Sequence, residues 1–334
     1  MSKPVRAAAE TAELAACLGS AGFRPCEIEP LPGDVSPRRY FRAAFADGGT
    51  AIVATYPPEV RAICPRFLRT SAILQEAGVR VPRVLAGDCA AGWMLLEDLG
   101  PQTLGDWGKG RPWSELGVFF EHALGLARRI ARLPPDGLAE LNPALGGELM
   151  VRELVQTWDL FLAPQGLLSD PALAADLRAA LDAVCDRLTA ETPVPCHRDF
   201  MVRNLMPLPA PGRLAVLDHQ DLRLGPPLYD LASLLNDTLF PPPEAEDALL
   251  ATLLFTAADR ESYHRAAAQR TLKAVGTYAS FASRGATRHL PLIAPTLSRF
   301  VSHFSRIPEG EPLAARLSRA WGSALESTVS SPIC

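Results

Sequence analysis

Short, largely apolar runs separated by turn residues in the first hundred residues predict a small antiparallel sheet. The stretches RYFRAAF (39–45) and TAIVATY (50–56) predict strands and flank ADGG, whose glycines are typical of a hairpin turn. RVPRVLAGD (80–88) and GWMLLEDLG (92–100) predict two more strands. Apolar residues three and four apart predict one helix before the sheet and a second, CPRFLRTSAILQEAG, that ends at Gly78.

Helix-type spacing of apolar residues dominates the rest of the chain. ELGVFFEHALGLARRIARL and PALAADLRAALDAVCDRLTAE both show it, and the segment from about Glu244 onward continues it, interrupted by proline-bearing loops at 291–295 and 308–312. The short apolar runs NLMPL and RLAVLDH around PAPG predict a hairpin among these helices. The pattern therefore predicts a two-lobed α+β protein, with a sheet-based lobe at 1–100 and a mainly helical lobe at 101–334.

Composition and charge narrow the class of protein. Of the 334 residues, 48% are hydrophobic and 21% are charged, and the formal net charge is −4. No basic block is present, so the sequence favours neither nucleic acid nor an anionic membrane as a partner. No apolar run is long enough to cross a bilayer, and Glu10 and Glu13 interrupt any secretory signal core near the N-terminus.

The cysteines are scattered, odd in number and form no Cys-x-x-Cys pair. This pattern argues against a disulfide framework and against a zinc site. It predicts reduced thiols and a cytoplasmic protein. The seven cysteines are Cys17, Cys26, Cys64, Cys89, Cys185, Cys196 and Cys334.

Three polar side chains stand out among apolar, strand-like residues. Asp199 and Asn204 are five residues apart in a loop that precedes a predicted strand, and Asp218 ends the returning strand of the same hairpin. Carboxylate and amide oxygens are hard ligands that suit Mg²⁺, and a second carboxylate could accept a proton from a hydroxyl group. Kinase-type transfer of a phosphoryl group needs these parts, so the constellation predicts that chemistry.

The spacing H-R-D-x-x-x-x-N is met by the stretch from His197 to Asn204. Together with LAVLDHQDLRLGPPLYDLASLL, this stretch resembles the aminoglycoside phosphotransferase and choline kinase superfamily, which has a protein-kinase-like fold. The resemblance implies that Asp199 is the catalytic base and that Asn204 and Asp218 bind Mg²⁺. It also implies that Asp221 assists the metal, directly or through water.

Two residues of the same region are interpreted as structural support. His197 is expected to fix the loop of the HRD stretch. GPPLYDLASLL matches the G-x-P-x-x-D-L-A pattern of the superfamily, which implies that Asp230 anchors the catalytic loop from the start of a helix. His219, which follows Asp218, is expected to pack in the interior, because Mg²⁺ prefers oxygen ligands.

The nucleotide-binding residues are predicted from the strand region. LPGDVSPRRYFR occupies the place of a phosphate-covering loop, where Ser36, Arg38 and Arg39 could donate to phosphate oxygens. The carbonyl of Glu97 and the amide of Leu99 are the expected adenine contacts. Kinase-like enzymes usually carry a lysine on the third strand, but TAIVATYPPE has none. We therefore expect an arginine of the loop to replace it, with Arg39 ranked before Arg38.

Several further stretches, from GDVSPRRYFR to QRTLKAVGTYASFASRG, resemble one branch of the superfamily, the bacterial anomeric kinases of N-acetylmuramate and N-acetylglucosamine. The resemblance implies an enzyme that uses ATP and Mg²⁺ to phosphorylate the anomeric hydroxyl of an amino sugar during cell-wall recycling. Two alternatives remain open. One is an aminoglycoside or choline-type kinase, and the other is a pseudokinase that binds a nucleotide and regulates a partner.

Overall fold

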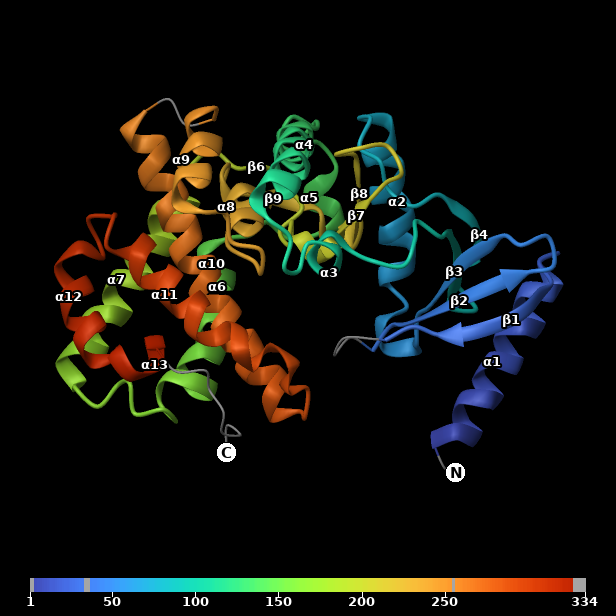
Figure 1. Cartoon of the computed structure of the whole chain (residues 1–334), viewed down its shortest axis with the longest axis horizontal. Helices are drawn as coiled ribbons and strands as arrows, with labels where there is room; N and C mark the ends of the chain where they lie inside the picture. Colours follow the sequence, from blue (N-terminus) through green and yellow to red (C-terminus); the bar gives the residue numbers. More distant parts are fainter. Residues whose placement is uncertain (1–2, 33–36, 254–255, 327–334) are drawn as a thin grey trace. The chain divides into compact units, whose positions relative to one another are not determined.

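The structure is a computed structural model that describes residues 3–32, 37–253 and 256–326. The chain forms two compact units, and Figure 1 traces them along the sequence. The N-terminal unit comprises Met1–Pro101 together with Ala215–Gln220, and the C-terminal unit comprises Gln102–Leu214 and Asp221–Cys334. The N-terminal unit is therefore not one continuous stretch of chain, because a six-residue segment from the middle of the sequence belongs to it.

The N-terminal unit contains the predicted antiparallel sheet. Its five strands lie in the order β1-β2-β3-β5-β4, and every neighbouring pair is antiparallel. The hairpin of β2 and β3 turns at Gly48, whose φ of +82° favours glycine. The strands are β1 (Pro25–Pro30), β2 (Arg39–Phe45), β3 (Thr50–Thr55), β4 (Val84–Asp88) and β5 (Trp93–Glu97).

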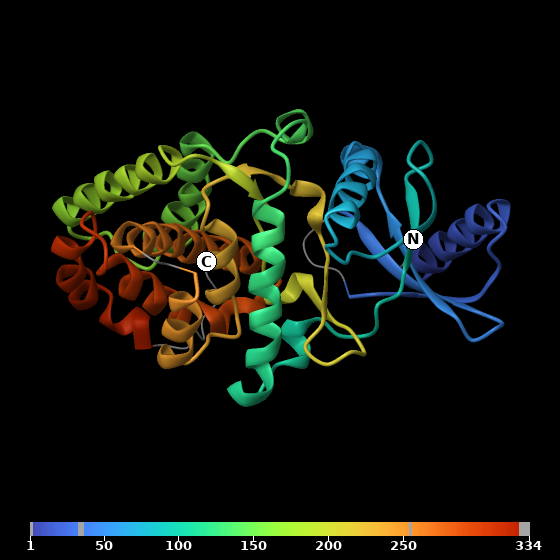
Figure 2. The same cartoon turned by 90° about the horizontal axis from the view of Figure 1, so that it is seen from above.

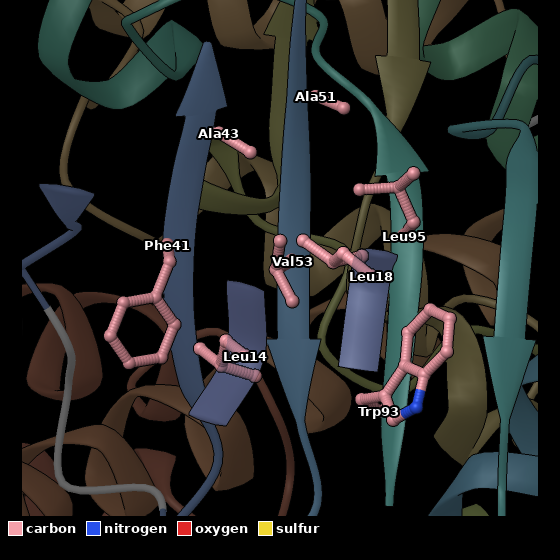
Figure 3. Packing of buried hydrophobic residues seen from close by; sticks show 8 residues of the cluster. All are labelled: Leu14, Leu18, Phe41, Ala43, Ala51, Val53, Trp93 and Leu95. Atoms are coloured by element: carbon pink, nitrogen blue, oxygen red, sulfur yellow. The ribbon is translucent and has the colours of Figure 1, made fainter. Parts of the chain in front are cut away.

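A helix covers each face of the sheet because the strand residues alternate. Figure 3 shows the face covered by α1 (Lys3–Ser20), where Leu14 and Leu18 pack against side chains of the three central strands. Those side chains are Phe41, Ala43, Ala51, Val53, Trp93 and Leu95. The intervening residues face α2 (Ile63–Glu76), including Ala54, Met94 and Leu96. As predicted, α2 ends just before Gly78, which has a φ of +71°.

The expectation that no disulfide forms is wrong. Cys64, in the first turn of α2, is bonded to Cys89, in the turn between β4 and β5, with their Cα atoms 5.5 Å apart. The two cysteines are 25 residues apart in the sequence, so their spacing alone did not reveal the pair. The disulfide also removes the argument from cysteines for a reducing compartment.

Helices make up most of the C-terminal unit. The long helix α10 packs against α6, α8 and α11, as Figure 2 shows from above. Close packing of α10 on α6 requires Gly276, since an added Cβ would lie 2.5 Å from the backbone nitrogen of Thr157. The longer helices are α4 (Trp113–Ala131), α6 (Gly147–Thr157), α7 (Pro171–Thr189), α8 (Tyr229–Leu235), α9 (Pro243–Ala251), α10 (Ala257–Ser283), α11 (Ile293–Phe304) and α12 (Glu311–Ala320).

Short elements complete the C-terminal unit. A π-helix at Trp158–Leu162 continues α6, and 3-10 turns lie at Val202–Asn204 and Thr287–Leu292. The predicted loop at 291–295 is only partly correct, because α11 begins at Ile293 and accommodates Pro295 in its first turn, where a missing N–H costs little. The remaining short helices are α3 (Leu104–Trp107), α5 (Leu138–Leu141) and α13 (Gly322–Glu326).

Two pairs of short strands lie in the segment 194–225, which contains Asp199, Asn204 and Asp218. β6 (Val194–Cys196) pairs antiparallel with β9 (Arg223–Gly225). β7 (Leu205–Pro207) and β8 (Leu214–Val216) are the strands of the predicted hairpin, whose turn is closed by a 2.9 Å bond from the Leu208 N–H to the Arg213 carbonyl. None of the helices in the described ranges combines the length and apolar character that a bilayer span needs.

Candidate active site

The loop from His197 to Asn204 is held in place by a buried carboxylate. Asp230, in the first turn of α8, accepts the His197 N–H at 2.7 Å through Oδ2 and the Arg198 N–H at 2.9 Å through Oδ1. Arg198 has a φ of +75°, a strained conformation for a residue with a side chain. Burial raises the pKa of Asp230 to about 6, although both backbone bonds oppose the shift. These are the contacts expected of a structural anchor.

Asp199 lies on this loop beside two cations. Its carboxylate oxygen Oδ1 is 3.2 Å from Nη2 of Arg270 and 3.8 Å from Nζ of Lys273, both on α10. Burial alone would raise the pKa of Asp199, but Lys273, Arg270 and Arg198 outweigh it and hold that pKa well below the usual range. The side chain remains 25% exposed, so it is an ionised carboxylate that is still accessible.

A second carboxylate links Lys273 to the loop. Glu153, on α6, pairs with Arg198 at 2.6 Å and with Lys273 at 3.1 Å. Burial would raise the pKa of Glu153, but the two cations hold it below its ordinary value. Glu153, Arg270 and Lys273 are not among the residues predicted from the sequence. A signal was present for the basic pair, since they lie three residues apart in AAAQRTLKAVG, a run whose other residues are uncharged.

Asn204 uses the nitrogen of its amide within the loop. Nδ2 donates to the backbone carbonyl of Asp199 at 2.8 Å. An amide oriented by its nitrogen keeps its oxygen for another partner, and an amide oxygen suits a hard cation. Asn204 therefore has the orientation that a metal ligand needs.

Asp221 has different surroundings from those of Asn204. Its carboxylate lies 3.3 Å from Arg198 and 3.4 Å from Arg223. Two guanidinium groups compensate its charge, whereas Asp218 pairs with one among the described residues. Of these two carboxylates, Asp221 is therefore the weaker candidate for a metal ligand. Across the described parts of the chain, no group of three or more His, Cys, Asp or Glu side chains is placed to hold a metal ion.

His197 is fully buried at the start of the loop. Its ring meets the ring of Phe200 edge-on, with 5.8 Å between the centroids. The position inside the C-terminal unit agrees with the supporting role inferred from the sequence.

Asp218 belongs to the N-terminal unit and is also strained, with a φ of +57°. Its Oδ1 accepts from Nη2 of Arg38 at 2.7 Å and from Nε2 of Gln220 at 2.9 Å. The next residue, His219, is buried against α2. Its ring lies on Phe67, with 4.4 Å between centroids, and its Nδ1 is 2.8 Å from Oγ1 of Thr70. The prediction that His219 packs in the interior is confirmed.

Two arginines are ranked for the phosphate role, Arg38 immediately before β2 and Arg39 at its start, and they contact different partners. Arg39 pairs with Glu10 of α1 and lies 5.2 Å from the centroid of the Phe41 ring. Arg38 reaches Asp218, and its side chain is only 11% exposed. The geometry therefore favours Arg38 over Arg39, the reverse of the order given by the sequence. Ser36, the third candidate, lies outside the described residues.

The segment after β5 is fixed by ion pairs. Asp98 accepts from Nε of Arg42 at 2.7 Å and from the Gly100 N–H at 3.0 Å. The side chain of Glu97 pairs with Arg80 at 2.5 Å, so it serves the local structure. The roles predicted for Glu97 and Leu99 depend on their backbone groups and remain predictions.

The structure therefore groups the candidate residues within each unit. His197, Asp199, Asn204, Asp221 and Asp230 surround one loop of the C-terminal unit. In the N-terminal unit, Arg38 and Asp218 are in contact, whereas Arg39 is directed to α1. Glu97 and Leu99 lie at and just after the end of β5.

Known sequences that are similar to this chain point to one class of protein. The model of a phosphotransferase enzyme family matches residues 27–268. An N-acetylmuramate/N-acetylglucosamine kinase of Pseudomonas aeruginosa is 36% identical over 232 residues, which are 67% of this chain and 64% of that protein. The match therefore spans less than two thirds of that relative. A kinase of the same name from Pseudomonas putida is 31% identical over 85% of this chain and 84% of its own length.

Solved structures with similar folds are more distant in sequence. Choline kinase LicA from Streptococcus pneumoniae superimposes with a TM-score of 0.60 at 14% identity, covering 88% of this chain and 98% of its own. Aminoglycoside phosphotransferase APH(3'')-Id from Streptomyces rimosus does so with a TM-score of 0.55 at 20% identity, covering 79% and 98%. The likeness shows a shared protein-kinase-like fold and confirms the fold class expected from the sequence.

Proposed function

The chain belongs to the phosphotransferase enzyme family, and on this premise we propose that it transfers the γ-phosphoryl group of ATP to the anomeric hydroxyl of N-acetylmuramate or N-acetylglucosamine. The observation that carries the reaction type is the ionised, accessible Asp199 on an anchored loop. The substrate class is supported by relatives that bear the name of N-acetylmuramate/N-acetylglucosamine kinase.

In the proposed reaction, the hydroxyl oxygen of the sugar attacks the γ-phosphorus. A new O–P bond forms, the bond between the γ-phosphorus and the bridging oxygen breaks, and ADP leaves. Asp199 accepts the hydroxyl proton, directly from the attacking oxygen. A carboxylate of low pKa is a weak base, which suits a loose transition state in which the proton leaves late; its main task is to orient the hydroxyl.

Asn204 and Asp218 are the proposed ligands of Mg²⁺, each through a side-chain oxygen. When bound, the ion supplies charge neutralisation for the phosphates. The bond from the Asn204 nitrogen to the Asp199 carbonyl supports this assignment, because it orients the amide of Asn204. Asp221 is the third ligand expected from the sequence, and its two arginine partners argue for a role in the loop instead.

Asp199→Asn should retain ATP binding and lose turnover. The substitution preserves size and removes the proton acceptor, so kcat should fall by about 10²–10⁴-fold. ADP release measured with each amino sugar, together with calorimetric titration of ATP, checks both parts. Asp136→Asn, the same change at an exposed position, is the matched control and should behave like the parent. A folded Asp199→Asn protein with near-parental kcat would show that the base lies elsewhere.

Asn204→Ala and Asp218→Ala should each weaken the Mg²⁺-dependent part of ATP binding. Each change removes one oxygen ligand of the metal, whereas the contacts of the protein to the adenine and ribose of ATP should be unchanged. Calorimetric titration with ATP at several Mg²⁺ concentrations measures the effect. Asp221→Ala is the informative comparison and should leave the Mg²⁺ dependence unchanged. If only Asp221→Ala alters that dependence, the assignment of the metal ligands is wrong.

Arg38→Ala should reduce kcat/KM for ATP, and Arg39→Ala should not. A positive partner for the phosphates is required because β3 offers no lysine, and Arg38 lies beside Asp218 whereas Arg39 is paired on α1. Loss of a charged hydrogen bond is worth about 1.5–3 kcal/mol, equivalent to roughly 10–10²-fold in rate. Steady-state kinetics measures kcat/KM for ATP in both variants, and each variant is the control for the other. A loss confined to Arg39→Ala would restore the order expected from the sequence.

A further inference from the structure

Two basic residues of α10 lie beside the candidate base. Arg270 and Lys273 are three residues apart, so they extend from the same side of the helix. Their side chains are 7% and 11% exposed. Long cationic side chains are seldom buried to this extent unless they are paired, and both are directed to Asp199.

Both cations approach the same oxygen of Asp199. Arg270 Nη2 and Lys273 Nζ lie 3.2 Å and 3.8 Å from Oδ1. Within the described ranges of the chain, the side-chain hydrogen bond that Asp199 accepts goes to Oδ1 and none goes to Oδ2, and the carboxylate is partly exposed. The two oxygens are therefore not equivalent. One is held by the protein, and the other is available to an incoming hydroxyl group.

The cations are themselves held by groups from other helices. Lys273 pairs with Glu153 of α6 at 3.1 Å, and Glu153 pairs with Arg198 at 2.6 Å. Nε of Arg270 donates to Oγ of Ser233 on α8 at 3.1 Å. Burial lowers the pKa of Lys273, with Asp199 and Glu153 opposing that shift. This frame fixes where the charges of Arg270 and Lys273 lie.

We infer that Arg270 and Lys273 are positioning residues for the phosphoryl transfer. Their contacts to Oδ1 of Asp199 fix the orientation of the carboxylate, so that Oδ2 is directed at the acceptor hydroxyl group. The inference deepens the proposed function and rests on it. It differs from a simple structural ion pair in one respect. A structural pair contributes to stability and need not change kcat, whereas a positioning residue changes kcat, and does so only while Asp199 is present.

A double-mutant cycle in kcat tests the inference. Lys273→Met removes the positive charge and retains the length of the side chain. It should lower kcat by about 10–10²-fold, because a small misplacement of a reacting group slows the reaction strongly. KM for ATP should change less than about twofold. Lys273→Arg should restore most of the rate. In an Asp199→Asn background, Lys273→Met should have little further effect. The probes are N-acetylmuramate and N-acetylglucosamine with ATP and Mg²⁺.

Lys109→Met is the matched control, because Lys109 is an exposed lysine whose side chain is 75% accessible. It should leave kcat and KM unchanged. Arg270→Lys, which keeps the charge and shortens the reach, provides a second variant if Lys273→Met folds poorly by circular dichroism. It should likewise lower kcat more than it raises KM for ATP.

Three results would overturn the inference. The first is a parental kcat in both Lys273→Met and Arg270→Lys. The second is an equal loss from Lys273→Met with and without Asp199. The third is a parent that phosphorylates neither sugar, which refutes the proposed function and with it the role inferred for Arg270 and Lys273. The first two results need an active parent, so the rate of the parent distinguishes them from the third.

Discussion

Keeping one accessible carboxylate ionised inside a helical unit is the constraint on which the rest of the site depends. Water stabilises a charged carboxylate, and burial removes part of that stabilisation. Asp199 remains charged because Arg270 and Lys273 of α10 lie within 4 Å of it. Lys273 is in turn paired with Glu153 of α6. The arrangement of α6 and α10 is thus tied to the charge of one side chain.

Two residues of the candidate regions have strained backbone conformations. Arg198, immediately before Asp199, adopts a left-handed conformation, and both oxygens of Asp230 receive N–H groups of that turn. Asp218 adopts a similar conformation in the N-terminal unit, beside Arg38 and the buried ring of His219. Such strain persists only where neighbouring contacts over-determine the conformation. In both places, the strained residue lies at or next to a carboxylate assigned to the chemistry.

Much of the fold could be predicted because its signals are local. The β2–β3 hairpin, the end of α2 before Gly78 and the helices α4 and α7 follow from periodicity and from glycine in the turns. The HRD spacing is equally local, so it places Asp199 and Asn204 in one loop.

The errors concern pairs of residues that are distant in the sequence. Cys64 and Cys89 meet because α2 and the β4–β5 turn are neighbours in three dimensions. Arg39 was ranked above Arg38 because the sequence does not show that Glu10 of α1 lies beside it. Arg270 and Lys273 were overlooked for the same reason, since their partner Asp199 is 71 residues away from Arg270. Hydrophobic periodicity places helices, but it does not specify which charged side chains meet.

The central claim is that this chain phosphorylates the anomeric hydroxyl of an amino sugar. Phosphorus-31 NMR of the reaction products with ATP, Mg²⁺ and, in separate samples, N-acetylmuramate, N-acetylglucosamine, choline and kanamycin tests it most directly. The account predicts a new phosphate monoester signal, coupled to the anomeric proton, with at least one of the two amino sugars, and unchanged ATP with choline and kanamycin. A product formed only with choline or kanamycin, a monoester at another hydroxyl, or no transfer to any acceptor would contradict it.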